Sequence, residues 1–510
     1  CGEHGGEPIS VRRFRQAGLD YVSASPYRVP IAYLQSAIDN ILVKQGKPLP
    51  PAPEFKLLAD EEVMDEEVMK APQEIKPIPA IKDASSIEEA LSQAVTLVKD
   101  RKITKKEAIG NLDLSKLAGG LSQGLLGNSD FQRILSWAKE IKSVGIEALV
   151  ENEQWIARLG GLSQAEGIFV QTENTFLDII EATRRLIFAD TDTRRKEEME
   201  KLAKLQSGFY NALFDKQNLS GRAVTIRLLN LGLKSFIQGL TAEEIDELAA
   251  YLGIDRGVIQ KKIKLYFENN PSFGNKGSRL ALTLHPDLYR AQLRAIFLAS
   301  IAQEVSSEVN ILAPFLIEAK EFIAMKELIE EVANQVRKET GKELKYKIIP
   351  AIATPRASLS AERFAPETDS AVIDAVELTD GVLGMTKADA QKFLPDYLKE
   401  GIYPADPYKA IYEEAVGLLL REAILRARQV NPNIRFSVRG YSNDPVSLEF
   451  FHQAGADTII SSPEDLGLAI LSAAQAAIKF PRPAADSSAM IEAQKPGAAS
   501  SPVTSDSAAS

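Results

Sequence analysis

The chain is poor in the residues that build disulfides and metal centres. Its 510 residues include one cysteine, three histidines and two tryptophans. One cysteine excludes a disulfide within the chain and fits a reducing compartment, so we predict a cytoplasmic protein. The histidines, His4, His285 and His452, are far apart in sequence, and no common zinc-ligand spacing is present.

Long apolar runs and an excess of positive charge are also missing. No stretch reaches eighteen uninterrupted apolar residues, so no membrane span is predicted. The formal net charge of −10 argues against a nucleic-acid partner. What is present is ordinary for a globular protein, with 45% hydrophobic and 25% charged residues, in a length that suits two or three domains.

Composition divides the chain into five parts. Residues 1–43 have a helix–strand–helix pattern, and residues 44–82 mix prolines with charge runs, which is typical of a linker. Residues 83–143 have a helical pattern. In residues 144–480 short β-branched runs alternate with helical patterns, which indicates βα units around a parallel sheet. Residues 481–510 are small and polar, and we predict a disordered tail.

Eight candidate strands lie between residues 144 and 480. They are GIEALV, GIFVQ, AVTIRLL, VNILAPF, YKIIPAIA, SAVIDAV, IRFSVRG and DTIISSP. Eight strands separated by helices predict an α/β fold of the (β/α)8, TIM-type barrel class.

The end of this barrel is repeated at the start of the chain. PISVRRFRQAGLDYVSASPYRVPIAYL (8–34) matches PVSLEFFHQAGADTIISSPEDLGLAIL (445–471) in its Pro, Ser, Phe, Gln-Ala-Gly, Asp and Ser-Pro positions. The segment at 445 closes a barrel whose other strands precede it, whereas the segment at 8 follows no strands. We therefore expect residues 1–43 to be the truncated C-terminal end of another barrel.

These residues resemble the PEP-utilising enzyme family, and within it the pyruvate, phosphate dikinases. The motifs that carry the resemblance are CGEHGGEP, AEGIFVQTEN, VTIRLL, ENNPSFGNKGSRL, ATPRASLSAERFA and KFLPDYLKEGIYPADPY. It covers residues 1–43 closely and about 85–480 in degenerate form. The resemblance implies pyruvate and PEP as ligands, Mg²⁺ as cofactor, a homodimer formed through the barrel, and conversion of ATP, phosphate and pyruvate to AMP, diphosphate and PEP.

By resemblance, Cys1 is the acid or base at the methyl carbon of pyruvate. A thiol suits this task because neighbouring charges tune its pKa. Glu3 and His4 would support its glycine-rich loop. A second interpretation is also open, in which Cys1 carries the lipid of an anchored binding protein.

In residues 144–480 the positions that match the family's active site are mostly changed. The family binds phosphoryl groups with two arginines, which suit phosphate because they can pair with it bidentately. The first of these positions holds Gln171 in this chain, and the second retains an arginine, Arg227. The positions of the family's two Mg²⁺ ligands hold Ala353 and Glu377 in this chain. The position of its acid or base cysteine holds Arg439.

Three further cations, Lys276, Arg279 and Arg356, remain near these motifs. We name Arg227 and Arg356 as the candidate substrate-binding residues. Losing one electrostatic group typically costs on the order of 10²–10³ in rate, so the combined losses predict a non-catalytic structural or regulatory barrel. The family's phosphohistidine loop and a glycine-rich nucleotide loop are not found. The alternative is a barrel with altered activity on a phosphorylated or 2-oxo acid.

Overall fold

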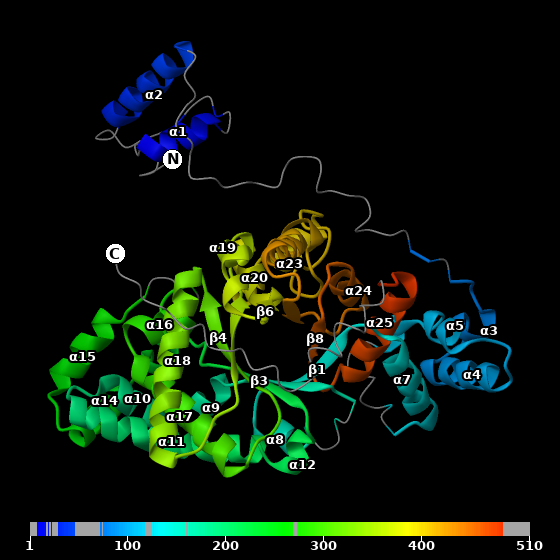
Figure 1. Cartoon of the computed structure of the whole chain (residues 1–510), viewed down its shortest axis with the longest axis horizontal. Coiled ribbons are helices and arrows are strands. Elements are labelled where there is room, and N and C mark those ends of the chain that lie inside the picture. Colours follow the sequence, from blue (N-terminus) through cyan, green and yellow to red (C-terminus); the bar gives the residue numbers. More distant parts are fainter. Residues whose placement is uncertain are drawn as a thin grey trace, which may run out of the picture. The chain divides into compact units, whose positions relative to one another are not determined.

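A computed structural model of the chain describes residues 8–16, 19, 22, 29–45, 72–73, 75–117, 125, 127–159, 162, 164–268 and 273–482. The chain forms two compact units, Cys1–Lys70 and Ala71–Ser510 (Figure 1). The described part of the first unit contains two helices, α1 (Pro8–Gln16) and α2 (Val29–Lys44). The predicted N-terminal residues Cys1, Glu3 and His4 lie outside the described residues.

The second unit contains a closed barrel of eight parallel strands in sequence order, which confirms the predicted (β/α)8 class. β8 pairs with β1, for example Thr458 beside Gly145, and this pairing closes the ring. The strands are β1 (Gly145–Val150), β2 (Gly167–Gln171), β3 (Ala223–Arg227), β4 (Val309–Leu316), β5 (Lys347–Ile352), β6 (Ser370–Asp374), β7 (Arg435–Arg439) and β8 (Thr458–Ser461).

Helices follow the strands and cover the barrel (Figure 1). Those between β1 and β4 are α8 (Glu153–Ile156), α9 (Glu173–Leu177), α10 (Ile180–Phe188), α11 (Asp192–Leu213), α12 (Lys216–Leu219), α13 (Lys234–Ile237), α14 (Ala242–Leu252), α15 (Arg256–Leu265), α16 (Gly277–Thr283) and α17 (Pro286–Ala302). Those after β4 are α18 (Ala319–Thr340), α19 (Pro355–Leu359), η5 (Ala361–Arg363), η6 (Ala365–Glu367), α20 (Ala375–Leu383), α21 (Lys387–Ala390), α22 (Leu394–Lys399), the π-helical η7 (Glu413–Gly417), α23 (Leu418–Val430), α24 (Pro445–Gln453) and α25 (Leu466–Lys479).

A helical segment precedes β1 and packs against α25 (Figure 1). Its elements are α3 (Pro79–Lys82), α4 (Ile87–Lys99), α5 (Lys105–Gly110), η3 (Leu114–Leu117) and α7 (Ser129–Ile141). Side-chain caps start its helices: Thr104 and Glu107 form a capping box on α5, and Asn128 accepts two backbone N–H bonds at α7. Gln475 of α25 donates to the carbonyls of Ile109 and Leu112, at 2.8 and 2.9 Å, and so ties the segment to the barrel.

The barrel interior is filled in layers. An apolar cluster inside the barrel is built by Phe169, Leu312, Ile349, Ala351, Val372 and Ile460, with the half-buried Leu149 packed against it. Side chains alternate along a strand, so residues two positions further along also point inward. At this next level, toward the C-terminal ends of the strands, lie Gln171, Arg227, Asp374 and Arg439. The fold therefore places charged residues at the end of the barrel where TIM-type enzymes keep their active sites, which we call the mouth.

The glycine that begins α16 has no room for a side chain. Gly277 has a φ of +55°, and a Cβ there would lie 2.8 Å from the Cβ of Phe315 and 2.9 Å from Asn230 Oδ1. The GNKGSRL motif thus packs directly against β4 and the end of β3, and it brings Lys276 to the mouth.

Candidate functional site

Arg227 lies at the end of β3 and is held by two carboxylates. Its guanidinium donates to Asp374 Oδ2 at 2.9 Å and to Glu173 Oε1 at 2.8 Å, and the residue is only 5% exposed. Burial alone would lower the pKa of Arg227, but the charges of Glu173, Glu377 and Asp374 outweigh it and raise the pKa. Arg227, named from the sequence as a candidate substrate-binding residue, is therefore neutralised by carboxylates of the chain itself.

Asp374 is the centre of the network at the mouth. It ends β6 and caps α20, where Oδ1 accepts the Glu377 backbone N–H at 3.1 Å. Both of its carboxylate oxygens also accept from Arg439, at 3.0 Å each. Burial would raise the pKa of Asp374, yet Arg439 and then Arg227 outweigh burial, so the pKa lies below its ordinary value and the carboxylate stays charged.

Arg439 occupies the end of β7, at the position that the family resemblance assigns to the acid or base cysteine. Besides Asp374 it donates to Gln171 Oε1 at 3.2 Å. Gln171 thus acts as an acceptor for Arg439. The position where the resemblance expects a thiol therefore holds a cation that is paired with a carboxylate.

Glu377 is held by two donors of its own. Asn230 Nδ2 donates to Glu377 Oε1 at 2.5 Å, and Lys276 Nζ lies 3.1 Å from the same oxygen. The Lys276 ammonium also sits 4.2 Å from the centre of the Phe315 ring. Burial, followed by repulsion from Glu377, raises the pKa of nearby Asp380 to about 6.

These contacts do not fit the Mg²⁺ ion that the family resemblance implies. A magnesium ion requires oxygen ligands in octahedral geometry. Glu377 Oε1 is already shared by an amide and an ammonium group, and the second expected ligand position, Ala353, is buried and has no side-chain oxygen. Within the described residues no group of three His, Cys, Asp or Glu side chains lies close enough to hold a metal ion.

Arg356 lies at the N-terminus of α19 and does not join this network. It forms an ion pair with Glu318, which also lies near Arg363 Nη1 at 3.6 Å. The side chain of Arg356 is 58% exposed. Of the residues named from sequence, the structure thus brings Arg227 and Glu377 together at the mouth and leaves Arg356 outside the network.

Sequence reasoning missed Asp374 and Glu173, the two carboxylates that neutralise Arg227. A signal for both was present. Asp374 lies two residues after the inward-facing Val372 on β6, so strand alternation directs it toward the barrel mouth. Glu173 is the first residue of α9, two positions after β2 ends at Gln171, so it lies at the same end of the barrel. The ion pairs at the mouth join Arg227, Arg439 and Lys276 to Glu173, Asp374 and Glu377, and Asp380 adds a further carboxyl group beside Glu377.

A large hollow, of about 540 Å³, lies elsewhere, outside the barrel between α11, α17 and α18. Its charged walls pair with one another: Arg294 lies 2.7 Å from Glu339, and Arg290 lies 3.2 Å from Asp287. Paired walls of mixed sign do not select an anion or a cation.

Among the described helices, none has the length and hydropathy needed to cross a membrane.

Comparison with known proteins shows which family and which proteins this barrel is similar to. The family profile of the PEP-utilising enzyme, PEP-binding domain matches residues 127–478. Pyruvate, phosphate dikinase of Clostridium symbiosum is 33% identical over 359 residues, which are 69% of this chain and 40% of that protein. The chloroplastic pyruvate, phosphate dikinase of Mesembryanthemum crystallinum is 31% identical over 389 residues (72% and 40%). The pyruvate, phosphate dikinase of Rickettsia prowazekii (strain Madrid E) is 30% identical over 386 residues (72% and 43%). The chain spans about two fifths of the length of these curated relatives.

Proposed function

The chain belongs to the PEP-utilising enzyme family, and on that premise we propose that its barrel is a pyruvate, phosphate dikinase-like PEP-binding domain with a non-catalytic, structural or regulatory role. The observation that carries the proposal is the pairing of Arg227 with Asp374 and Glu173, at 2.9 and 2.8 Å. A phosphoryl group would have to displace two carboxylates from a buried guanidinium. The substitutions at Ala353 and Arg439 support the same conclusion, because they replace an oxygen ligand and a group able to exchange protons near neutral pH.

Calorimetry with PEP tests this proposal. We expect no binding of PEP in the micromolar range by the full chain, with or without Mg²⁺, since the mouth offers neither a free arginine nor an open metal site. The dikinase of Clostridium symbiosum, measured in the same way, is the positive control. Metal-dependent micromolar binding that is lost in Arg227→Met but kept in Arg356→Met would contradict the proposal.

A second measurement addresses the alternative of an altered activity. Exchange of the pyruvate methyl protons with deuterium, followed by NMR, reports proton abstraction without requiring a complete phosphoryl-transfer cycle. We expect no exchange above the rate in buffer, because the position expected to hold a proton-transferring thiol is occupied by Arg439. Exchange that depends on the protein would instead support activity on a 2-oxo acid.

From the family resemblance we also propose that the protein is a cytoplasmic homodimer associated through the barrel. Leu418 and Leu425, two turns apart on α23, are 53% and 40% exposed and supply apolar surface for such a contact. Light scattering of the full chain should give twice the 55.8 kDa chain mass, and a mass of one chain would contradict this proposal.

A further inference from the structure

The carboxylate of Asp374 is bound as a ligand would be bound. Two arginines reach its two oxygens at 2.9–3.0 Å: Arg227 Nη1 donates to Oδ2, and Arg439 Nη1 lies at 3.0 Å from both Oδ1 and Oδ2. Such charge-assisted hydrogen bonds from arginine to a carboxylate are stronger than those between neutral groups. Asp374 is 2% exposed, so these contacts are made out of water, where charge-assisted hydrogen bonds are strongest.

We infer that Arg227 and Arg439 form a carboxylate-binding site at the barrel mouth, and that the side chain of Asp374 fills it as a built-in ligand. The site is closed to carboxylates from solution while Asp374 is present, and it accepts a small monocarboxylate when that side chain is removed. The inference deepens the proposed non-catalytic role and rests on it, because it names what occupies the old substrate position.

Two features of the cluster support this assignment. The Nε atoms of Arg227 and Arg439 are both buried and have no hydrogen-bond partner, so the pair keeps donor capacity that Asp374 does not use. Asp374 is also the carboxylate that forms an ion pair with Arg439 among the described residues. Without it, Arg227 retains Glu173, whereas Arg439 retains only the neutral amide of Gln171.

A ligand from solution can reach the site. The side chain of Arg439 is 18% exposed, so one wall of the site borders water. Truncation of aspartate to alanine leaves a space shaped for a carboxylate with at most a methyl group attached. Formate and acetate are therefore the probes that match the space, whereas phosphate and sulfate carry more oxygen atoms than the missing group.

The test is chemical rescue of Asp374→Ala, followed by thermal unfolding of the full chain at pH 7 and constant ionic strength. We expect the variant to melt on the order of 10 °C below the parent protein in chloride, because two buried cations lose their shared partner. Replacing chloride with formate or acetate should raise the melting temperature of the variant by several degrees in a saturable way. The parent protein should show no such rise, because its site is filled.

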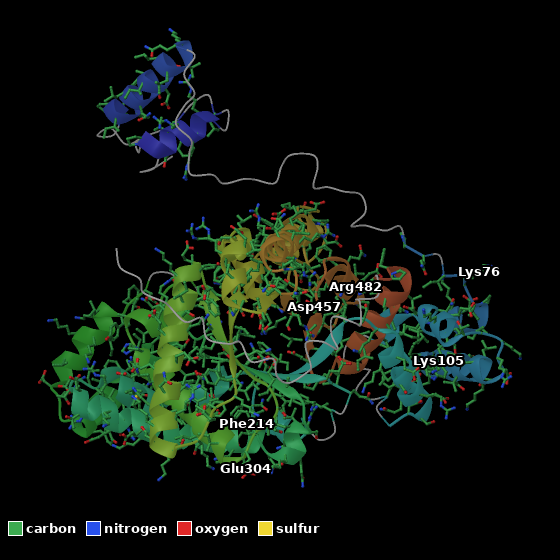
Figure 2. All side chains as sticks on the ribbon, viewed as in Figure 1. Lys76, Lys105, Phe214, Glu304, Asp457 and Arg482 are labelled. Carbon is green, nitrogen blue, oxygen red and sulfur yellow. The ribbon has the colours of Figure 1, made fainter. Side chains whose placement is uncertain are left out.

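Two controls separate rescue from general salt effects. Asp374→Asn fills the space without a charge and should be destabilised but not rescued. Asp457→Ala (Asp457 and Arg482 are labelled in Figure 2) removes a carboxylate that forms an ion pair with one arginine, Arg428, at 2.9 Å in the same barrel. Arg482 interacts with Asp457 only at longer range, so this variant should not respond to acetate. Equal responses of all three variants, or a response to phosphate without one to formate or acetate, would overturn the inference.

If Asp374→Ala is recovered only as aggregate, the inference is tested by comparing its refolding yield in acetate with that in chloride. Equal yields overturn the inference.

The outcomes also separate the proposed non-catalytic role from the inference of a built-in ligand. Binding of PEP by the parent protein would overturn the non-catalytic role even if acetate rescues the variant. Failure of rescue overturns the built-in ligand and leaves the calorimetric test of the non-catalytic role unaffected.

Discussion

The helix pairs α1–α2 and α24–α25 have the same sequence pattern in different surroundings. α1 and α24 are both nine residues long, and each helix of the second pair begins 437 residues after its counterpart (8 and 445, 29 and 466). The predicted repeat is thus a repeat of helix boundaries as well as of residues. The strand of the second copy is β8, whereas most of the matching segment of the first copy lies outside the described residues.

The two pairs differ in what covers their apolar faces. Leu468 and Leu471 of α25 are fully buried against the barrel and the helical segment before it, whereas their counterparts Ile31 and Leu34 on α2 are 44% and 63% exposed. What α2 buries instead is polar: Asp39 accepts from Arg12 of α1 at 3.0 Å. An amphipathic pattern therefore determines which face of a helix is apolar, and the surrounding elements determine whether that face is buried.

Matched substitutions at the apolar positions should give the largest contrast. Leu471→Asp places a charge in a fully buried position and should destabilise the barrel by at least about 4 kcal/mol, or prevent folding. Leu34→Asp changes an exposed position and should leave the barrel's melting temperature within about 2 °C of the parent value. Thermal unfolding of the full chain, followed by circular dichroism, measures both.

Two results would break this comparison. A fall in melting temperature for Leu34→Asp that approaches the fall for Leu471→Asp would mean that the α2 face is covered in solution. A folded Leu471→Asp with an unchanged melting temperature would mean that α25 is not part of the cooperative unit.

Much of the barrel was predictable because its strands are short β-branched runs separated by amphipathic helices. A buried parallel strand needs only local sequence to be recognised. The mouth was less predictable, since its contacts depend on which strand ends meet around a closed ring. Arg227 and Asp374 are 147 residues apart, and their pairing follows from inward alternation on β3 and β6 together. Sequence alone identified the changed positions Gln171 and Arg439 but not the acid that joins their network.

A histidine in the second pair makes the two copies differ in their response to pH. His452 of α24 is 1% exposed and lies 2.8 Å from the carbonyl of Phe480, and its counterpart in α1 is Arg15. Burial, followed by repulsion from Arg482, lowers the pKa of His452 to about 4 from an ordinary value near 6.5. The unfolded chain therefore takes up a proton before the folded chain does, and the barrel loses stability as the pH falls from 6.5 to 4.

The size of this effect is about 3 kcal/mol across that range, from 1.36 kcal/mol per pKa unit. His452→Gln should remove this part of the pH dependence, so urea unfolding at pH 7 and pH 4.5 should show a smaller difference for the variant than for the parent protein. Glu147 acts in the opposite direction, because burial raises its pKa to about 7, but it is present in both proteins and cancels in the comparison. An identical pH dependence in both would show that His452 is not buried in its neutral form.

The smallest contrast concerns the ion pair that joins each pair of helices. Arg12 and Glu449 occupy matched positions with opposite charge: Arg12 contacts Asp39 at 3.0 Å, and Glu449 contacts Lys479 at 2.6 Å. Asp39 is fully buried, whereas the Glu449 and Lys479 side chains are 27% and 36% exposed. Glu449→Ala should therefore cost less than about 1 kcal/mol of barrel stability, and Glu449→Lys with Lys479→Glu should restore it.

Arg12→Ala should cost α1–α2 more, about 1–3 kcal/mol, because it leaves the Asp39 carboxylate with Gln35 as its remaining side-chain donor, at 2.8 Å. Limited proteolysis between residues 8 and 44 measures this local loss, and cleavage there should accelerate several-fold in Arg12→Ala while the barrel's unfolding curve stays unchanged. Glu449→Ala is the matched control and should not change that cleavage. Equal cleavage of Arg12→Ala and the parent protein would show that the helices of the first pair are not held by this contact, and that the resemblance of the two copies ends at their sequence.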